Sequence, residues 1–112
     1  MNEQNLKLCM ELCKQCADAC ETCASACESE ANTMMRSCIE HDMDCADFCR
    51  LTASFIARGS EFTELVCQDC AEICTACAEE CEKHASEHCR LCAEACRRCA
   101  EECLKVGAAE YA

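Results

Sequence analysis

Six cysteines near the start of the chain recur at alternating spacings of four and three residues. They lie in the segment CMELCKQCADACETCASAC, at Cys9, Cys13, Cys16, Cys20, Cys23 and Cys27. This spacing follows the buried stripe of an α-helix, where leucine or isoleucine is the usual residue. Thiols on such a stripe could form disulfides, carry out redox chemistry or bind soft metal ions as thiolates. The pattern therefore predicts a helix whose inward face carries chemically active groups.

The stripe of cysteines corresponds to the a and d positions of a heptad, and we call these positions the seam. Cysteine fills every seam position in CQDCAEICTACAEEC and in CRLCAEACRRCAEEC. In the segment before them it fills only some of these positions. The cysteines concerned are Cys38, Cys45, Cys49, Cys67, Cys70, Cys74, Cys77, Cys81, Cys89, Cys92, Cys96, Cys99 and Cys103. In the sparser segment the other seam positions hold Met35, Asp42, Thr52 and Ile56.

These four stretches predict four helices, in a chain that has no proline and two glycines. We expect the helices at 3–29, 32–58, 61–83 and 86–106. Asn32 and Ser60 are the expected N-caps, and Gly59 and Gly107 the expected residues that follow a helix C-terminus. The connections are short, so neighbouring helices must run antiparallel. The predicted fold class is all-α: one domain over residues 1–112, an antiparallel up-down-up-down four-helix bundle about 40 Å long with a cysteine-lined core.

The two ends of this bundle differ in composition. At the histidine end, where the first and third helices finish, all three histidines and three of the five methionines gather beside seam cysteines. The opposite end, the plug end, collects large apolar residues and predicts a hydrophobic plug: Leu6, Leu51, Phe55, Ile56, Phe62, Leu65, Val66, Leu104 and Val106. The bundle is therefore predicted to be closed at one end and open to ions at the other.

Composition limits the classes of function. Leu, Ile, Val and Phe number 15 of 112 residues, so thiols must replace the missing aliphatic volume. The net charge of −12 and the lack of a basic patch argue against nucleic-acid binding. The N-terminal residues do not resemble a signal peptide, and no apolar run is long enough to span a membrane. We therefore expect a cytosolic protein whose thiols are kept reduced.

Three kinds of thiol chemistry fit this pattern poorly. Disulfides are disfavoured by the odd number of cysteines, nineteen, and by the 5–6 Å between Cβ atoms at helical spacing, against about 3.5–4.5 Å in a disulfide. Iron–sulfur clusters prefer C-x₂-C-x₂-C runs, which do not occur here. A structural zinc site needs four ligands, and a zinc tetrathiolate keeps a charge of −2. Deprotonating every thiol takes the formal charge from −12 to −31, and uncompensated burial of that charge is prohibitive.

Monovalent copper balances the charge most simply. Cu(I) is soft, selects thiolates and accepts two or three of them, so that one sulfur can bridge two ions. One Cu⁺ for each thiolate returns the protein to its starting charge of −12. The spacing and the charge together favour roughly one copper ion per cysteine.

Four residues outside the thiol set are further candidate ligands. Asp42 occupies a seam position between Cys38 and Cys45, and a buried carboxylate needs a partner. We expect a histidine or a metal ion as that partner, or else partial solvation at an open mouth. His41, His84 and His88 lie at flanking or loop positions of the histidine end, where they are either ligands or ordinary surface residues.

The repeated CxxCxxxC motif, with CIEHDMDCADFC and CEKHASEHCRLCAEAC, resembles the bacterial copper storage proteins and most of all their cytosolic branch. The resemblance covers nearly the whole chain. It implies a four-helix bundle, folded without metal, that binds many Cu(I) ions in its core and is commonly a tetramer. Carried over to this sequence, it makes every seam cysteine a thiolate ligand.

The resulting hypothesis is a cytosolic store for Cu(I), not an enzyme, with copper entering at the histidine end and a copper chaperone as a candidate partner. Two alternatives stay open. One is a thiol redox protein, which needs exposed cysteines of lowered pKa. The other is a zinc or cadmium detoxification protein, which competition between Cu(I) and Zn²⁺ would separate.

Overall fold

Four long helices make up nearly all of the described chain. A computed structural model describes residues 3–30 and 33–108. The helices are α1 (Glu3–Glu28), α2 (Arg36–Ala57), α3 (Thr63–Cys81) and α4 (Glu87–Ala108), and a short 3₁₀ turn, η1 (Thr33–Met35), precedes α2. The described ranges contain no strand. The predicted all-α class and the number of helices are confirmed.

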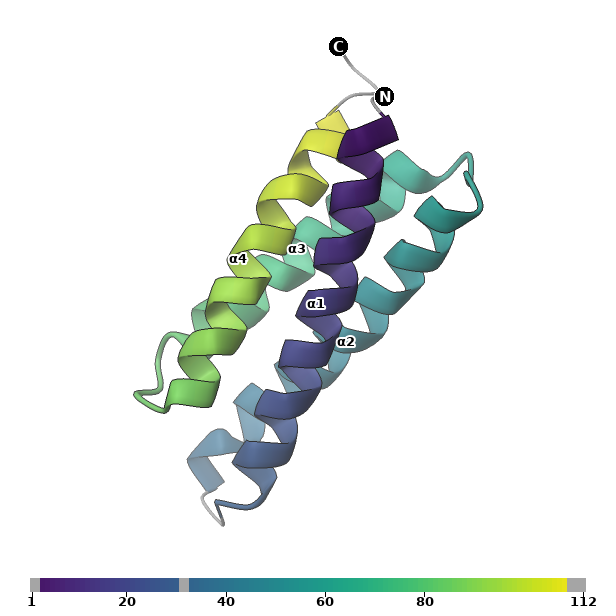
Figure 1. Cartoon of the computed structure of the whole chain (residues 1–112). Coiled ribbons are helices and arrows are strands. Elements are labelled where there is room, and N and C mark those ends of the chain that lie inside the picture. The colour runs from purple at the N-terminus through teal and green to yellow at the C-terminus, as the bar shows by residue number, and fades with distance from the viewer. Residues whose placement is uncertain (1–2, 31–32, 109–112) are drawn as a thin grey trace.

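The helices lie side by side as an antiparallel bundle (Figure 1). Each contacts two neighbours: α1 packs on α2 and α4, and α3 packs on the same two helices. The start of α1 and the end of α4 therefore lie at the same end of the molecule (Figure 1). The bundle measures 45 × 21 × 18 Å, close to the length predicted from helical rise.

Cysteine and alanine form the core. Behind the cysteine seam stands a second row of small residues, each directly after a d position: Ala17, Ala24, Ala46, Ala53, Ala71, Ala78, Ala93 and Ala100, all buried. Small side chains let the helices approach closely, so that thiols from facing helices come into contact. The interior is a column of sulfur bounded by methyl groups.

The residues at the helix ends depart from the predictions in two places. Gly59 does follow α2 with a positive φ of 64°, as predicted. Ser60 is not the N-cap of α3, because that helix starts at Thr63 with Phe62 as its N-cap; the Ser60 hydroxyl instead accepts a hydrogen bond from the Phe62 N–H at 3.0 Å. Gly107 does not follow α4 but lies inside it and is buried. Asn32 lies outside the described residues.

The predicted hydrophobic plug is only partly present. Val66 and Val106 are buried, and Leu6 and Ile56 pack against the core. The remaining large apolar residues assigned to the plug do not close the bundle: Phe55 is half-buried, and Leu51, Phe62, Leu65 and Leu104 are exposed. These apolar side chains face outward, because cysteine and threonine occupy the inward-facing positions on the same helical turns. None of the helices in residues 3–30 and 33–108 has both the length and the apolar composition that crossing a bilayer requires.

Candidate metal centre

All nineteen cysteines point into the bundle. Each is at most 1% exposed, and all nineteen are free thiols. Helical periodicity explains this, because residues spaced by three and four stay on one face for the full length of a helix. The inward direction predicted for the seam is confirmed for every cysteine, and Asp42 and Thr52 on the same seam are also fully buried.

The sulfur atoms are close enough to share ions. Sγ–Sγ distances between facing helices start at 3.6 Å, as for Cys9–Cys103 and Cys49–Cys74, and continue to 4.0 Å, as for Cys20–Cys77. A disulfide needs about 2.05 Å, so these are contacts between separate thiols. Two sulfurs bound to one ion at about 2.3 Å stand about 3.8–4.0 Å apart in tetrahedral or trigonal geometry. The interior is therefore preorganised at distances that metal thiolates adopt.

The thiols form overlapping groups of four along the bundle axis. Within each group all four Sγ atoms lie within 4.8 Å of one another. Four of the groups form a chain by sharing members, since Cys16, Cys20, Cys96 and Cys99 each belong to two of them, whereas the group at the histidine end shares none with those four. Five such groups are Cys13–Cys70–Cys99–Cys103, Cys16–Cys49–Cys74–Cys99, Cys16–Cys20–Cys45–Cys96, Cys20–Cys77–Cys92–Cys96 and Cys23–Cys27–Cys38–Cys89. A shared sulfur suits bridging ions in a continuous cluster better than it suits isolated tetrahedral sites.

Asp42 stands within this column, with thiols as its partners. Its Oδ1 atom accepts hydrogen bonds from Cys77 and Cys92 at 3.3 Å and from Cys81 at 3.5 Å. Burial, followed by the charge of Cys92 as thiolate, raises the pKa of the Asp42 carboxyl to about 10. The expected histidine partner is therefore wrong, and so is partial solvation at an open mouth. Asp42 is a neutral, fully buried carboxylic acid among thiols.

Burial raises the pKa of two thiols near the histidine end, whereas hydrogen bonds from Cys23 and Cys81 lower the pKa of Cys38 beside them to about 3. Loss of hydration raises the pKa of Cys89 to about 11 and that of Cys27 well above its ordinary value. Reactive redox cysteines have the opposite properties, since they are exposed and have lowered pKa values. Cys27 and Cys89 therefore become thiolates when a metal ion replaces the proton.

His88 is the histidine that the structure brings to the thiols. Its Nδ1 atom lies 3.5 Å from Cys89 Sγ, 3.6 Å from Cys23 Sγ and 3.9 Å from Cys27 Sγ. Its Nε2 atom is 2.5 Å from Glu30 Oε1. A carboxylate on the far nitrogen fixes the ring and leaves Nδ1 directed at the sulfurs. His88 and the last group of four thiols together form a nitrogen–sulfur site at the histidine end.

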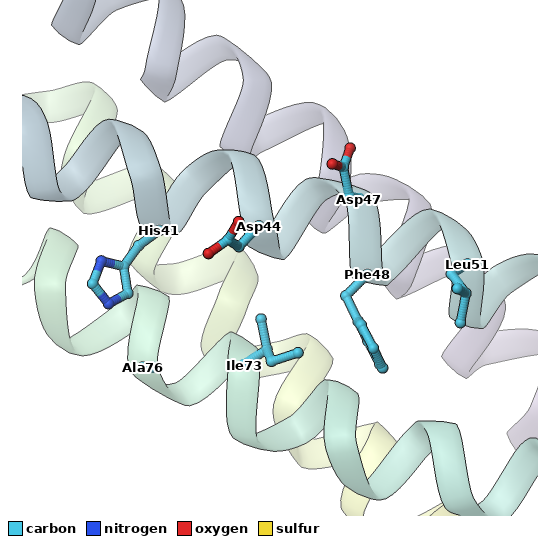
Figure 2. A pocket seen from close by; sticks show the side chains of 7 residues that line it. All are labelled: His41, Asp44, Asp47, Phe48, Leu51, Ile73 and Ala76. Atoms are coloured by element: carbon cyan, nitrogen blue, oxygen red, sulfur yellow. The ribbon is translucent and has the colours of Figure 1, made fainter.

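The other histidines do not reach the thiol column. His41 Nδ1 is 2.8 Å from the Ser37 carbonyl oxygen, and the ring lies on the outside of the bundle between α2 and α3 (Figure 2). His84 Nε2 is 3.1 Å from Glu80 Oε2. Desolvation of the Glu80 carboxyl opposes ionisation, but hydrogen bonds from His84 and Lys83 outweigh it and lower the Glu80 pKa. Both rings are held by oxygen atoms and not by sulfur.

Of the methionines at the histidine end, one is in the core. Met35 is buried there, whereas Met34 and Met43 are exposed. Sequence reasoning missed Glu30, the partner of His88, because it lies beyond the end of α1, where heptad periodicity carries no information. It also missed the row of buried alanines, although an alanine directly after each d residue could have been predicted to lie at the edge of the buried face.

Known proteins share both the sequence pattern and the fold. The model of the copper storage protein family (Csp) matches residues 2–108. The Cu(I)-bound copper storage protein BsCsp3 is 38% identical, over 92% of this chain and 98% of that one, with a TM-score of 0.89. Metal-free copper storage protein 3 from Bacillus subtilis is 40% identical, over 90% and 97%, with a TM-score of 0.87.

A cytosolic copper storage protein from Streptomyces lividans, solved with five coppers, is 44% identical over 94% of this chain and 93% of that one, with a TM-score of 0.90. No curated protein matches the sequence significantly. The family model matches residues 2–108, and the three solved structures each cover 90% or more of this chain. By its sequence, its fold and its sulfur-lined interior, the chain belongs to the copper storage protein family.

Proposed function

We propose that this protein stores many Cu(I) ions in the cytosol, bound by the thiolates that line its bundle. The observation that carries the proposal is the column of nineteen buried thiols, sixteen of which fall in the five groups of four named above. Cu(I) suits that column because it bridges sulfurs and neutralises one thiolate per ion. The cytosolic location is supported by the Streptomyces lividans relative.

The proposal includes all nineteen cysteines as ligands and His88 as the first ligand that an incoming ion meets. His88 lies at the end of the column with its side chain 21% exposed, and its Nδ1 atom is directed at three thiols. Asp42 is a further oxygen donor within the column, whereas His41 and His84 have no part in the loading path. The protein acts as a store and not as an enzyme, assembles with copies of itself, and receives copper from a chaperone.

A titration of the reduced protein with Cu(I), against a competing chelator, tests the storage proposal. We expect the protein to take up more than ten ions per chain, approaching one per cysteine, because the groups of four share sulfurs. Zn²⁺ added to the loaded protein should not displace copper, since Cu(I) is the softer ion. Saturation at one or two ions per chain, or displacement by Zn²⁺, would contradict storage.

A pair of histidine variants tests where copper enters. His88→Ala should slow Cu(I) uptake measurably in stopped-flow experiments, because it removes the nitrogen nearest the outermost thiols. His41→Ala is the matched control, since it also removes one imidazole but on the outside of the bundle. Final copper content should be nearly the same in both. Equal uptake rates for the two variants would place the opening elsewhere.

A further inference from the structure

A groove lies on the outside of the bundle, between the end of α3 and the first half of α4. It has a volume of about 640 Å³, which is within the range of pockets that hold small molecules. Its lining includes Cys81, Glu82, Arg90, Glu94, Arg97 and Arg98. Of these side chains, the storage proposal gives a role only to Cys81.

The charge of this part of the surface is opposite to that of the molecule as a whole. Residues 83–98 contain four basic and two acidic side chains, which gives a net charge of +2 in a chain whose total is −12. Three of the four basic residues line the groove: Arg90, Arg97 and Arg98. A local positive field on a strongly acidic protein attracts small anions to this place, whereas the rest of the surface repels them. We therefore expect the ligand of the groove to be an anion.

Two neighbouring arginines indicate that the anion carries a carboxylate. Arg97 donates two hydrogen bonds to the Glu82 carboxylate, with distances of 3.0 Å from Nε to Oε2 and 2.8 Å from Nη2 to Oε1. Arg98 is exposed, and within residues 3–30 and 33–108 it forms no ion pair. The planar guanidinium group matches a carboxylate at two points. The groove thus already holds one carboxylate and has a free guanidinium for another.

Cys81 connects the groove to the thiol column. It is the last residue of α3, it lines the groove, and its side chain is fully buried. Its Sγ atom lies 3.6 Å from Cys38 Sγ and 3.5 Å from Asp42 Oδ1. Cys38 belongs to the group of four thiols at the histidine end, so one thiol contact joins that group to Cys81. The groove therefore meets the column directly beside its outermost group.

The stored ion limits the chemistry of the ligand further. Cu(I) leaves a thiolate only for another soft donor, and thiols are the soft donors among the small molecules of a reducing cytosol. A groove of this size admits a small molecule and not a protein domain. A ligand that satisfies both the charge of the groove and the chemistry of copper carries a thiol together with at least one carboxylate.

We propose that the groove binds a small anionic thiol, which withdraws Cu(I) from the store through Cys81. This inference rests on the proposed storage function. A carboxylate of the ligand takes the place of Glu82 on Arg97 and is also held by Arg98, which frees the residue that follows Cys81. The thiol sulfur then bonds to the ion held by Cys81, the bond between copper and Cys81 breaks, and the thiol proton passes to the Cys81 sulfur. A second thiol displaces the remaining protein thiolate in the same way, and the ion leaves bound to two small thiolates.

Copper release by two thiols of opposite charge tests this proposal. The loaded, reduced protein is mixed with glutathione, which is anionic, or with cysteamine, which is cationic, and a coloured Cu(I) chelator records the copper that leaves. Added salt should slow release by glutathione, because salt screens exposed charges, and should not slow release by cysteamine. S-Methylglutathione has the same carboxylates without a free thiol, so it should compete with glutathione and slow the release.

A pair of arginine variants places the effect in the groove. Arg98→Glu should lower the rate of release by glutathione about fivefold and should not lower the rate with cysteamine. Arg58→Glu is the matched control, since Arg58 is an exposed arginine beyond the end of α2 that forms no ion pair within the described ranges. Both variants change the net charge by the same amount. Circular dichroism and the copper content before release should be the same in all three proteins.

Three results would each overturn the groove as the binding site. They are equal glutathione rates for Arg98→Glu and Arg58→Glu, an equal loss of rate with cysteamine in Arg98→Glu, and no competition by S-methylglutathione. Copper storage would stand in each of these cases, because the copper content is measured before any thiol is added. A low copper content in the loaded wild type would instead contradict storage itself.

Discussion

At the scale of single residues, Asp42 shows how a buried group links stability to pH. The folded protein holds its carboxyl among Cys38, Cys77, Cys81 and Cys92 with a pKa of about 10, whereas the unfolded chain releases that proton near pH 4. Between these values the folded state holds one proton more than the unfolded state. The stability that this group contributes is therefore fully present below about pH 4 and is lost as the pH rises towards 10.

Replacing Asp42 with asparagine should remove this pH dependence. We expect the free energy of unfolding of the wild type to fall relative to Asp42→Asn by about 1.4 kcal/mol per pH unit between about pH 5 and about pH 7. Urea denaturation of the reduced, copper-free proteins at several pH values measures the difference. Asp44→Asn, an exposed carboxylate on the same helix, is the control and should leave the slope unchanged. Identical slopes for wild type and Asp42→Asn would mean that the carboxyl ionises in the folded state.

At the scale of helices, periodicity predicted the seam correctly and local rules predicted the ends poorly. Seam positions repeat over many helical turns, so one irregular residue does not change which face of the helix is predicted to be buried. All nineteen cysteines are in fact buried. The end of a helix, by contrast, depends on a single local contact. Gly107 is an example: a Cβ there would lie 2.6 Å from Gln68 Cγ, so the glycine allows α3 and α4 to approach and does not end the helix. That contact is between helices and is not visible in local sequence.

The histidine end was predicted less well for a similar reason. The sequence correctly indicated that all three histidines lie at the same end of the bundle. The direction of each imidazole ring, however, depends on the oxygen atom with which it forms a hydrogen bond. Glu80 holds His84, and the Ser37 carbonyl holds His41, whereas Glu30 holds the far side of His88. Only the last arrangement leaves a nitrogen facing sulfur. Proximity to the end of a bundle therefore did not decide which histidine meets the thiols.

Gly59 offers a test of the turn between α2 and α3. A Cβ at this position would meet nothing within 4 Å, so the cost of alanine comes from the backbone alone, at a φ of 64°. We expect Gly59→Ala to lower the free energy of unfolding by about 1–2 kcal/mol, and Gly59→Asn to cost less, because asparagine tolerates this conformation better. The urea midpoint should shift with an unchanged m value. An equal midpoint for wild type and Gly59→Ala would mean that the turn relaxes elsewhere.

At the scale of the whole molecule, charge decides which ion can fill the interior. The protein carries a formal charge of −12 when its thiols are counted as protonated, and one Cu⁺ per thiolate restores that charge at full loading. Before full loading, an ion held by two thiolates displaces two protons and leaves −1, and later ions that bridge the same sulfurs cancel this charge. A divalent ion in a tetrathiolate site instead displaces about four protons and leaves −2 inside. Neutrality at full loading is the physical reason why a core of this size can be filled completely with a univalent ion.

Proton release and electrophoretic mobility together measure this replacement. Adding Cu(I) to the reduced protein in an unbuffered solution should release about two protons per ion at first and about one proton per ion on average at saturation. Mobility in native electrophoresis should be the same for the saturated and the copper-free protein, because both carry a net charge near −12. Zn²⁺ is the control and should release more protons per ion bound. If copper binds with no proton release, and mobility towards the anode falls with each ion, the thiols keep their protons and charge balance cannot be what selects the ion. An average of one proton per ion at saturation ties the capacity to the number of inward thiols, so a Cys→Ser change anywhere in the column should lower the copper content by about one ion.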